Sequence, residues 1–119
     1  MRWTLALMFS VAGVAMAADR WIPVSETPGV QRTLLNVGYV VLNGNGNRVA
    51  TLRSIVNGGF KMDILTEFDC RARKQRALST STTDKDGHLI GAAGRSNSWF
   101  AGEEALGLSE ACSAPLAKP

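Results

Sequence analysis

The stretch Met62–Cys70, MDILTEFDC, contains the clearest strand signal in this chain of 119 residues. Successive side chains of a strand point to opposite faces, so residues two apart share a face. The apolar face, which we expect in the core, consists of Met62, Ile64, Phe68 and Cys70, with Thr66 among them. The acidic face, which we expect in solvent and partly neutralised by a neighbouring strand, consists of Asp63, Glu67 and Asp69.

Turn signals and β-branched residues on both sides of this stretch predict more antiparallel strands. Before it, Arg48–Val56 reads as a strand that follows two Asn-Gly pairs in Asn43–Asn47 and ends at Asn57–Gly59. After it, 75–83 and 88–92 form a hairpin around an Asp-Gly turn. Nearer the start, 21–24 is a short edge strand, and 34–42 is one bent strand or two short ones.

The last part of the chain predicts a short helix followed by a tail. We expect the helix over 103–112, with Glu103 and Glu104 in its first turn and Gly107 weakening it. Residues 113–119 are small, prolyl and polar, and we expect them to be disordered. The predicted fold class is mainly β (α+β): a small antiparallel sheet with a short C-terminal helix.

Residues 1–17 have the pattern of a cleavable signal peptide. Arg2 precedes an apolar run of about 14 residues, shorter than the roughly 20 of a membrane-spanning helix, and Ala15-Met16-Ala17 fits the cleavage rule. We expect cleavage after Ala17, or alternatively after Ala18, leaving a single domain over 18–112. No cysteine follows the cleavage site, so we expect a periplasmic or secreted protein, without a lipid anchor or a membrane span, that could be exposed at the cell surface.

Cys70 and Cys112 are the only cysteines, and in an oxidising compartment we expect them to form a disulfide. A metal site is the alternative, but two cysteines and His88 do not have a recognisable zinc spacing. We therefore expect neither a metal site nor another cofactor.

The composition argues against an enzyme and against a nucleic-acid-binding protein. Without Arg2 the chain keeps 12 basic and 10 acidic side chains, a net charge of +2 that is mild for nucleic-acid binding. His88 is the only histidine, and no G-x-S-x-G motif accompanies it. We expect no catalytic residues.

One basic cluster follows the acidic strand and, with a later tryptophan, is the candidate binding patch: Arg71, Arg73, Lys74, Arg76 and Trp99. The cluster could bind acidic glycans or an acidic protein surface. Alternatively, its charges pair across strands with Glu67 and Asp69. Trp99 could be a core or edge anchor, or an exposed binding residue.

The block Glu67–Ser79, EFDCRARKQRALS, resembles the bacterial surface-adhesin protein E family, whose members carry an aromatic-Asp-Cys block, basic residues and an Arg-x-Leu-Ser strand. Trp99 and the final Ala111-Cys112 extend the resemblance over 21–112. It implies a small antiparallel sheet packed by a terminal helix, with Cys70 and Cys112 bridged. It also implies non-catalytic adhesion to host extracellular-matrix or serum proteins, with self-association as a homodimer. The alternative function is a soluble periplasmic inhibitor or accessory protein, for example one that inhibits lysozyme.

Overall fold

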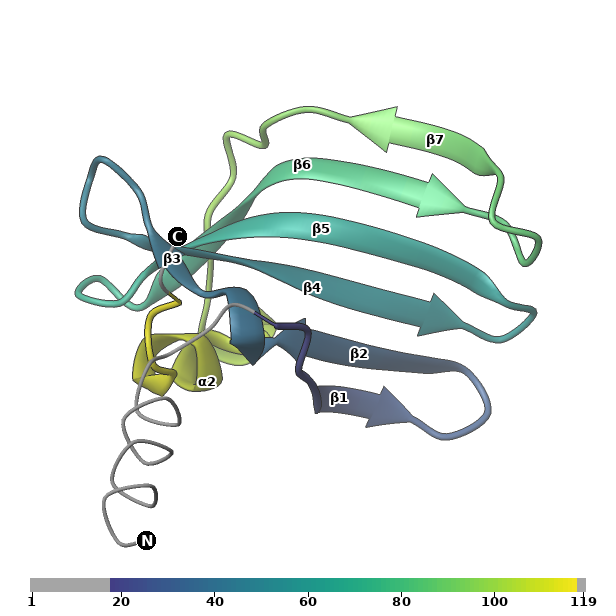
Figure 1. The fold of residues 1–119 in the computed structure, drawn as a ribbon, viewed down its shortest axis with the longest axis horizontal. Coiled ribbons are helices and arrows are strands. Elements are labelled where there is room, and N and C mark those ends of the chain that lie inside the picture. Colours follow the sequence, from purple (N-terminus) through teal and green to yellow (C-terminus); the bar gives the residue numbers. More distant parts are fainter. Residues whose placement is uncertain (1–17, 118–119) are drawn as a thin grey trace, which may run out of the picture.

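The computed structural model describes residues 18–117, so the expected signal peptide, 1–17, lies outside the described residues. The chain forms one antiparallel sheet with short helical segments, which confirms the mainly β fold class (Figure 1). The strands are β1 (Trp21–Thr27), β2 (Gln31–Asn36), β3 (Val41–Leu42), β4 (Arg48–Val56), β5 (Phe60–Asp69), β6 (Lys74–Thr83), β7 (Leu89–Ala93) and β8 (Phe100–Ala101). The helical segments are η1 (Val37–Tyr39), η2 (Gly102–Glu104) and α2 (Leu108–Ser113).

The strands follow one another across the sheet in the order β1-β2-β4-β5-β6-β7. Two strands pair with different parts of the same edge of β4: β2 pairs with residues 52–56 and β3 with residues 48–49. β6 is shared in the same way between β7 and β8. The break between β2 and β3 confirms the expected interruption of 34–42, since Asn36 Oδ1 accepts the N–H of Gly38 and starts η1.

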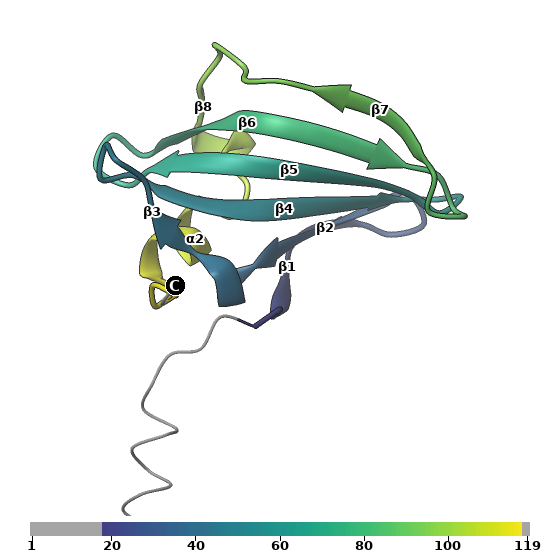
Figure 2. The same ribbon diagram turned by 45° about the horizontal axis from the view of Figure 1, so that its top comes forward.

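The core lies on one face of the sheet at the end that α2 covers. Figure 2 shows α2 below β3 and β4. Leu35, Leu52 and Phe68 project from the sheet, and Leu108 and Ala111 of α2 pack against them. The inward faces expected for Phe68 and Cys70 are confirmed. Burying these apolar side chains holds the helix on the sheet.

The predicted helix over 103–112 is wrong in its bounds. η2 ends at Glu104, and α2 begins only at Leu108. Gly107 lies between them with a φ of 78°, in the left-handed region, so a continuous right-handed helix cannot pass through it. A Cβ on Gly107 would lie 3.2 Å from Leu52 Cδ2, 3.6 Å from Val24 Cγ1 and 3.7 Å from Leu35 Cδ2, so the backbone here lies close to the sheet. We call the stretch from η2 to α2, residues 102–113, the covering segment.

The expected disorder of 113–119 is also wrong for the part of this segment that the structure describes, residues 113–117. Ser113 belongs to α2, Ala114 is only 9% exposed, and Leu116 packs against the core. The Ala117 N–H donates to the Val40 carbonyl at 2.8 Å. Arg48 Nη1 donates to the carbonyls of Ala111 and Ala114, which fastens this segment to β4.

Among the described residues, no helix has the length and apolar character needed to cross a membrane.

Candidate binding site

The turn between β5 and β6 carries most of the predicted binding patch. Asp69 closes the turn, because its Oδ1 accepts the N–H groups of Arg71 at 3.1 Å and Ala72 at 2.9 Å. Cys70 forms the expected disulfide with Cys112, which joins the turn covalently to α2. The loop that presents Arg71 and Arg73 is therefore restrained by the hydrogen bonds to Asp69 and by the disulfide.

Arg73 has an unusual backbone conformation within this turn. Its φ is 57°, and it is the only non-glycine residue with positive φ in the described part of the chain. A side chain in the left-handed region costs about 1–2 kcal/mol, and glycine would avoid this cost. Arg73 is exposed, and its Nη2 makes only a 3.5 Å contact with Ser109 Oγ.

Lys74 and Arg76 lie over the ring of Trp99. The Lys74 Nζ is 4.6 Å from the ring centroid, and the Arg76 guanidinium carbon is 4.5 Å from it. These are cation–π distances. Trp99 is half-buried and directly precedes β8, which pairs with β6, so it is an edge anchor that orients two basic side chains.

Glu67 was expected on a solvated strand face. It is instead buried, with 2% of its surface exposed. Asn43 Nδ2 and Asn47 Nδ2 each donate to Glu67 Oε2 at 2.8 Å, and Arg76 Nε donates to Oε1 at 3.0 Å. Desolvation raises the pKa of this carboxyl, but the hydrogen bonds from Asn47, Asn43 and Arg76 outweigh it and bring the pKa below its ordinary value.

The cross-strand pairing weighed for the basic cluster is therefore confirmed for Arg76 with Glu67. Among the described residues it is not found for Asp69, whose carboxylate accepts the backbone N–H groups of the turn. The other acid of this strand face, Asp63, pairs with Arg53 through Nε at 2.7 Å and Nη2 at 3.0 Å. Within residues 18–117, no ion pair involves Arg71 or Arg73.

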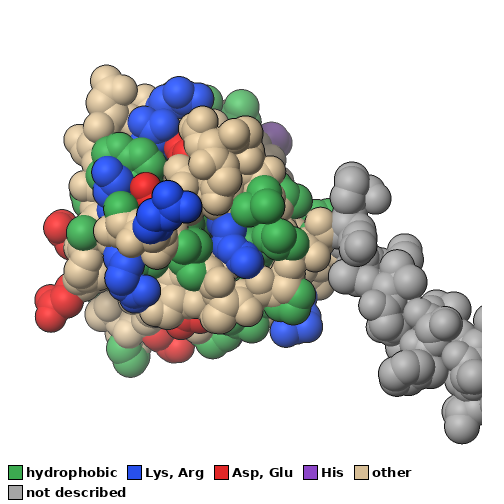
Figure 3. Space-filling model, turned by 90° about the vertical axis from the view of Figure 1, so that its left-hand side faces the viewer, with side chains coloured by type: hydrophobic (Ala, Val, Ile, Leu, Met, Phe, Trp, Pro, Cys, Tyr) green, Lys and Arg blue, Asp and Glu red, His purple; other side chains and the backbone are tan. Residues whose placement is uncertain are grey.

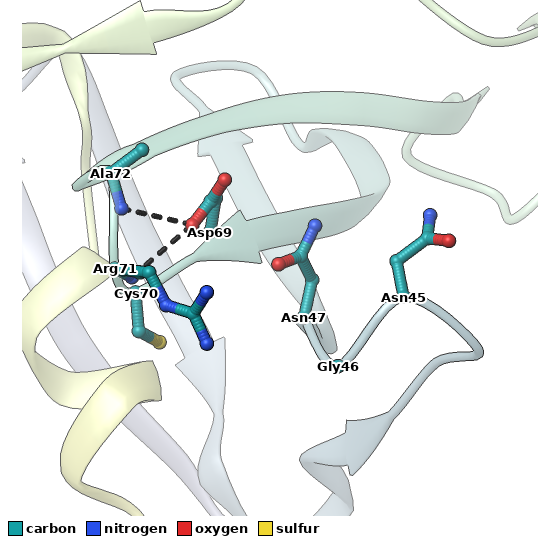
Figure 4. Close-up of a pocket in the computed structure, with 7 residues that line it drawn as sticks. All are labelled: Asn45, Gly46, Asn47, Asp69, Cys70, Arg71 and Ala72. Carbon is teal, nitrogen blue, oxygen red and sulfur yellow. Dashed lines mark hydrogen bonds between the residues drawn. The ribbon is translucent and has the colours of Figure 1, made fainter.

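A polar hollow of about 560 Å³ lies between the β3–β4 and β5–β6 turns. Figure 4 shows Asp69 and Arg71 on one side of it and Asn45 and Asn47 on the other. Guanidinium, carboxylate and amide groups can hydrogen-bond a polar partner here. Figure 3 shows many Lys and Arg side chains on this end of the molecule, with few acidic ones among them.

A second hollow, of about 420 Å³, lies on the inner face of the sheet beyond the covering segment. We call it the concave groove. Its apolar lining is Leu52, Val56, Met62, Ile64, Ala77, Phe100 and Leu106. Met62 was predicted in the core, but it is 36% exposed, because α2 does not extend over this half of the sheet.

His88 is exposed at the turn between β6 and β7, with Nδ1 3.4 Å from Asp84 Oδ2. Asp84, Asp86 and His88 each offer a ligand atom, and these atoms lie within 4.8 Å of one another. The Asp84 carboxylate accepts the N–H groups of His88 and Asp86, and these bonds lower its pKa. This group was not predicted from the sequence, although its Asp-x-Asp-Gly-His spacing can be seen there. The geometry is that of an ordinary hairpin turn.

No protein-family model matches the chain, and no curated protein or solved structure is significantly similar to it. The resemblance to the surface-adhesin protein E family thus stays a prediction from sequence.

Proposed function

We propose that the protein is an exported, non-enzymatic binding module that attaches to an acidic surface of a partner protein, in particular a host extracellular-matrix or serum protein. The observation that carries this proposal is the β5–β6 turn. An arginine occupies its left-handed position, where glycine would be easier, and its charge points to solvent. Backbone strain of this kind is concentrated at functional sites.

The charge distribution supports the same proposal. The charge of Arg76 is neutralised by Glu67, whereas the charges of Arg71 and Arg73 are available to a partner. Lys74 is oriented by Trp99 beside them. Three basic groups on a turn fixed by a disulfide form a preorganised surface, and preorganised groups bind with a smaller loss of conformational entropy.

Export is part of the proposal and rests on the predicted signal peptide together with the disulfide. Disulfides persist in the periplasm and outside the cell and are rare in the cytosol. The resemblance to the surface-adhesin protein E family also supports a partner outside the cell.

The test is binding of the purified mature chain to a panel of immobilised extracellular-matrix and serum proteins, measured by biolayer interferometry. We expect saturable binding that weakens as NaCl rises from about 0.05 to 0.5 M, because exposed charges are screened over this range. The variant Arg73→Gly should bind at least about fivefold more weakly, since rim charges contribute about 1 kcal/mol. Glycine suits the left-handed backbone, so this variant should be at least as stable as the wild type.

The matched control is Arg32→Ser. Arg32 is also exposed, but it pairs in register with Ile55, near the opposite end of the sheet. The variant Arg32→Ser loses the same charge as Arg73→Gly and should bind like the wild type. The proposal is wrong if no protein of the panel binds, or if the double variant Arg71→Ser/Arg73→Gly binds as tightly as Arg32→Ser.

A further inference from the structure

The covering segment lies over one end of the inner face of the sheet and leaves the concave groove open beside it. Towards the β4–β5 turn, Val56 and Met62 project from the sheet into the concave groove, and Phe100 of β8 also lines it. All three side chains are more than a third exposed. The volume of about 420 Å³ is within the range of small-molecule sites, about 300–1,000 Å³.

One residue of the groove lining, Gln75, has a buried polar atom without a hydrogen-bond partner. Gln75 is 5% exposed, and its Nε2 donates to the Leu106 carbonyl at 3.0 Å. This bond fixes which end of the amide is the oxygen. Gln75 Oε1 is the one buried side-chain nitrogen or oxygen of residues 18–117 without a hydrogen-bond partner. Buried acceptors are normally paired, so this atom calls for a donor.

The neighbouring polar groups indicate what kind of donor would fit. Thr66 lies beside Gln75 in the lining and donates its own hydroxyl hydrogen to the Ile64 carbonyl at 2.9 Å, so only its lone pairs remain free. Glu104 is exposed in the lining, and its negative charge disfavours an anionic ligand. The guanidinium of Arg76 is bound to Glu67. Besides the hydroxyls of Thr33, Ser54 and Thr80, which can donate or accept, the groove therefore offers acceptors and an apolar wall.

We propose that the concave groove binds a small neutral amphiphile. Its apolar body lies against Val56, Met62 and Phe100, and its hydroxyl or amide N–H donates to Gln75 Oε1. This site is separate from the basic turn, and either proposal can fail while the other holds.

The probe is 1-aminoanthracene, a neutral apolar fluorophore with N–H donors, added to the mature chain at about pH 7.5, where carboxylic acids are ionised. We expect saturable fluorescence enhancement at one site. Three competitors share a ten-carbon chain: 1-decanol, decyl methyl ether and decanoate. The ether has no donor, and decanoate is charged, so both should displace the probe about tenfold less effectively than 1-decanol.

Two variants on β5 give a matched pair. Met62 and Leu65 are similarly exposed, at 36% and 39%, but they lie on opposite faces of the sheet. Met62→Arg should reduce probe affinity at least about tenfold by placing a charge in the groove. Leu65→Arg should leave it unchanged. Gln75→Met should keep probe binding but remove the preference for the alcohol over the ether.

Several results would overturn the proposal. One is that the ether displaces the probe from the wild-type chain as effectively as the alcohol does. This measurement needs no variant. Another is equal probe affinity of Met62→Arg and Leu65→Arg. A third is that the wild type binds no probe and forms a dimer in analytical ultracentrifugation, which Met62→Arg dissociates and Leu65→Arg does not. The groove would then hold a second copy of the chain.

Discussion

At the scale of single residues, Glu67 joins three parts of the chain that are distant in sequence. It lies on β5, accepts two amide groups from the β3–β4 turn, and pairs with Arg76 of β6. A buried carboxylate needs such partners, because desolvation strongly disfavours its charge. The same carboxylate therefore positions the turn, the strand and the cation that stacks on Trp99.

Replacing Glu67 with alanine should lower the free energy of unfolding by about 3–5 kcal/mol, since Arg76 and two amides would lose their acceptor inside the protein. Urea unfolding of the mature chain, followed by circular dichroism, measures this loss. Glu67→Gln keeps the size and one acceptor and should lose less. A change below about 1 kcal/mol for Glu67→Ala would contradict the structural role argued for this carboxylate.

The lowered pKa of Glu67 gives the same prediction a pH dependence. Its stabilisation is fully present above the unfolded-state pKa, about 4.3 for glutamate, and is lost as the pH falls towards the folded-state value. The unfolding free energy of the wild type should therefore fall on acidification below about pH 5. Glu67→Gln should show a shallower fall in the same urea experiments.

At the scale of elements, local signals predicted the strands, and contacts across the fold set the helix. Alternation in Met62–Cys70 and the Asn-Gly and Asp-Gly turns depend on neighbouring residues alone, so the hairpins could be predicted. The start of α2 depends on where Gly107 meets Leu52, Val24 and Leu35, and no short stretch of sequence contains that contact. The burial of Glu67 was missed for the same reason, because its amide partners are about 20 residues away.

Gly107→Ala should lower the free energy of unfolding by about 1–3 kcal/mol. The residue has a φ of 78°, and a Cβ there would lie 3.2 Å from Leu52 Cδ2. Gly102→Ala is the control: Gly102 has a φ of 64° but nothing within 4 Å of its Cβ position, so it isolates the backbone cost. Thermal and urea unfolding measure both. Equal losses of unfolding free energy in the two variants would show that close packing at Gly107 does not add to the backbone cost.

At the scale of the whole molecule, the sheet is longer than the segment that covers it. β5 has ten residues, roughly 33 Å of strand, and α2 has six residues, roughly 9 Å of helix. Alternation in the sequence indicates which face of β5 turns inward but not how far its cover extends. Phe68 was therefore correctly assigned to the core and Met62 was not, and the concave groove could not be predicted.

The disulfide should contribute substantially to the stability of so small a domain. The double variant Cys70→Ser/Cys112→Ser should unfold with a free energy lower by about 4 kcal/mol, because a closed loop with a sequence separation of 42 restricts the unfolded chain. Urea unfolding of the double variant, compared with the wild type with and without reductant, tests this. A loss below about 1 kcal/mol would contradict it, and the reduced wild type should match the variant.

The bridge also determines how the molecule would carry a mechanical load. Tension applied at the two ends of the chain passes from α2 through the Cys112–Cys70 sulfurs directly into β5, and the intervening segment stays slack. About 42 residues, roughly 150 Å of contour length, are thus shielded from stretching. That segment includes Arg71, Arg73, Lys74 and Trp99, so a tether pulled from its ends would not extend the chain that carries the proposed contact surface.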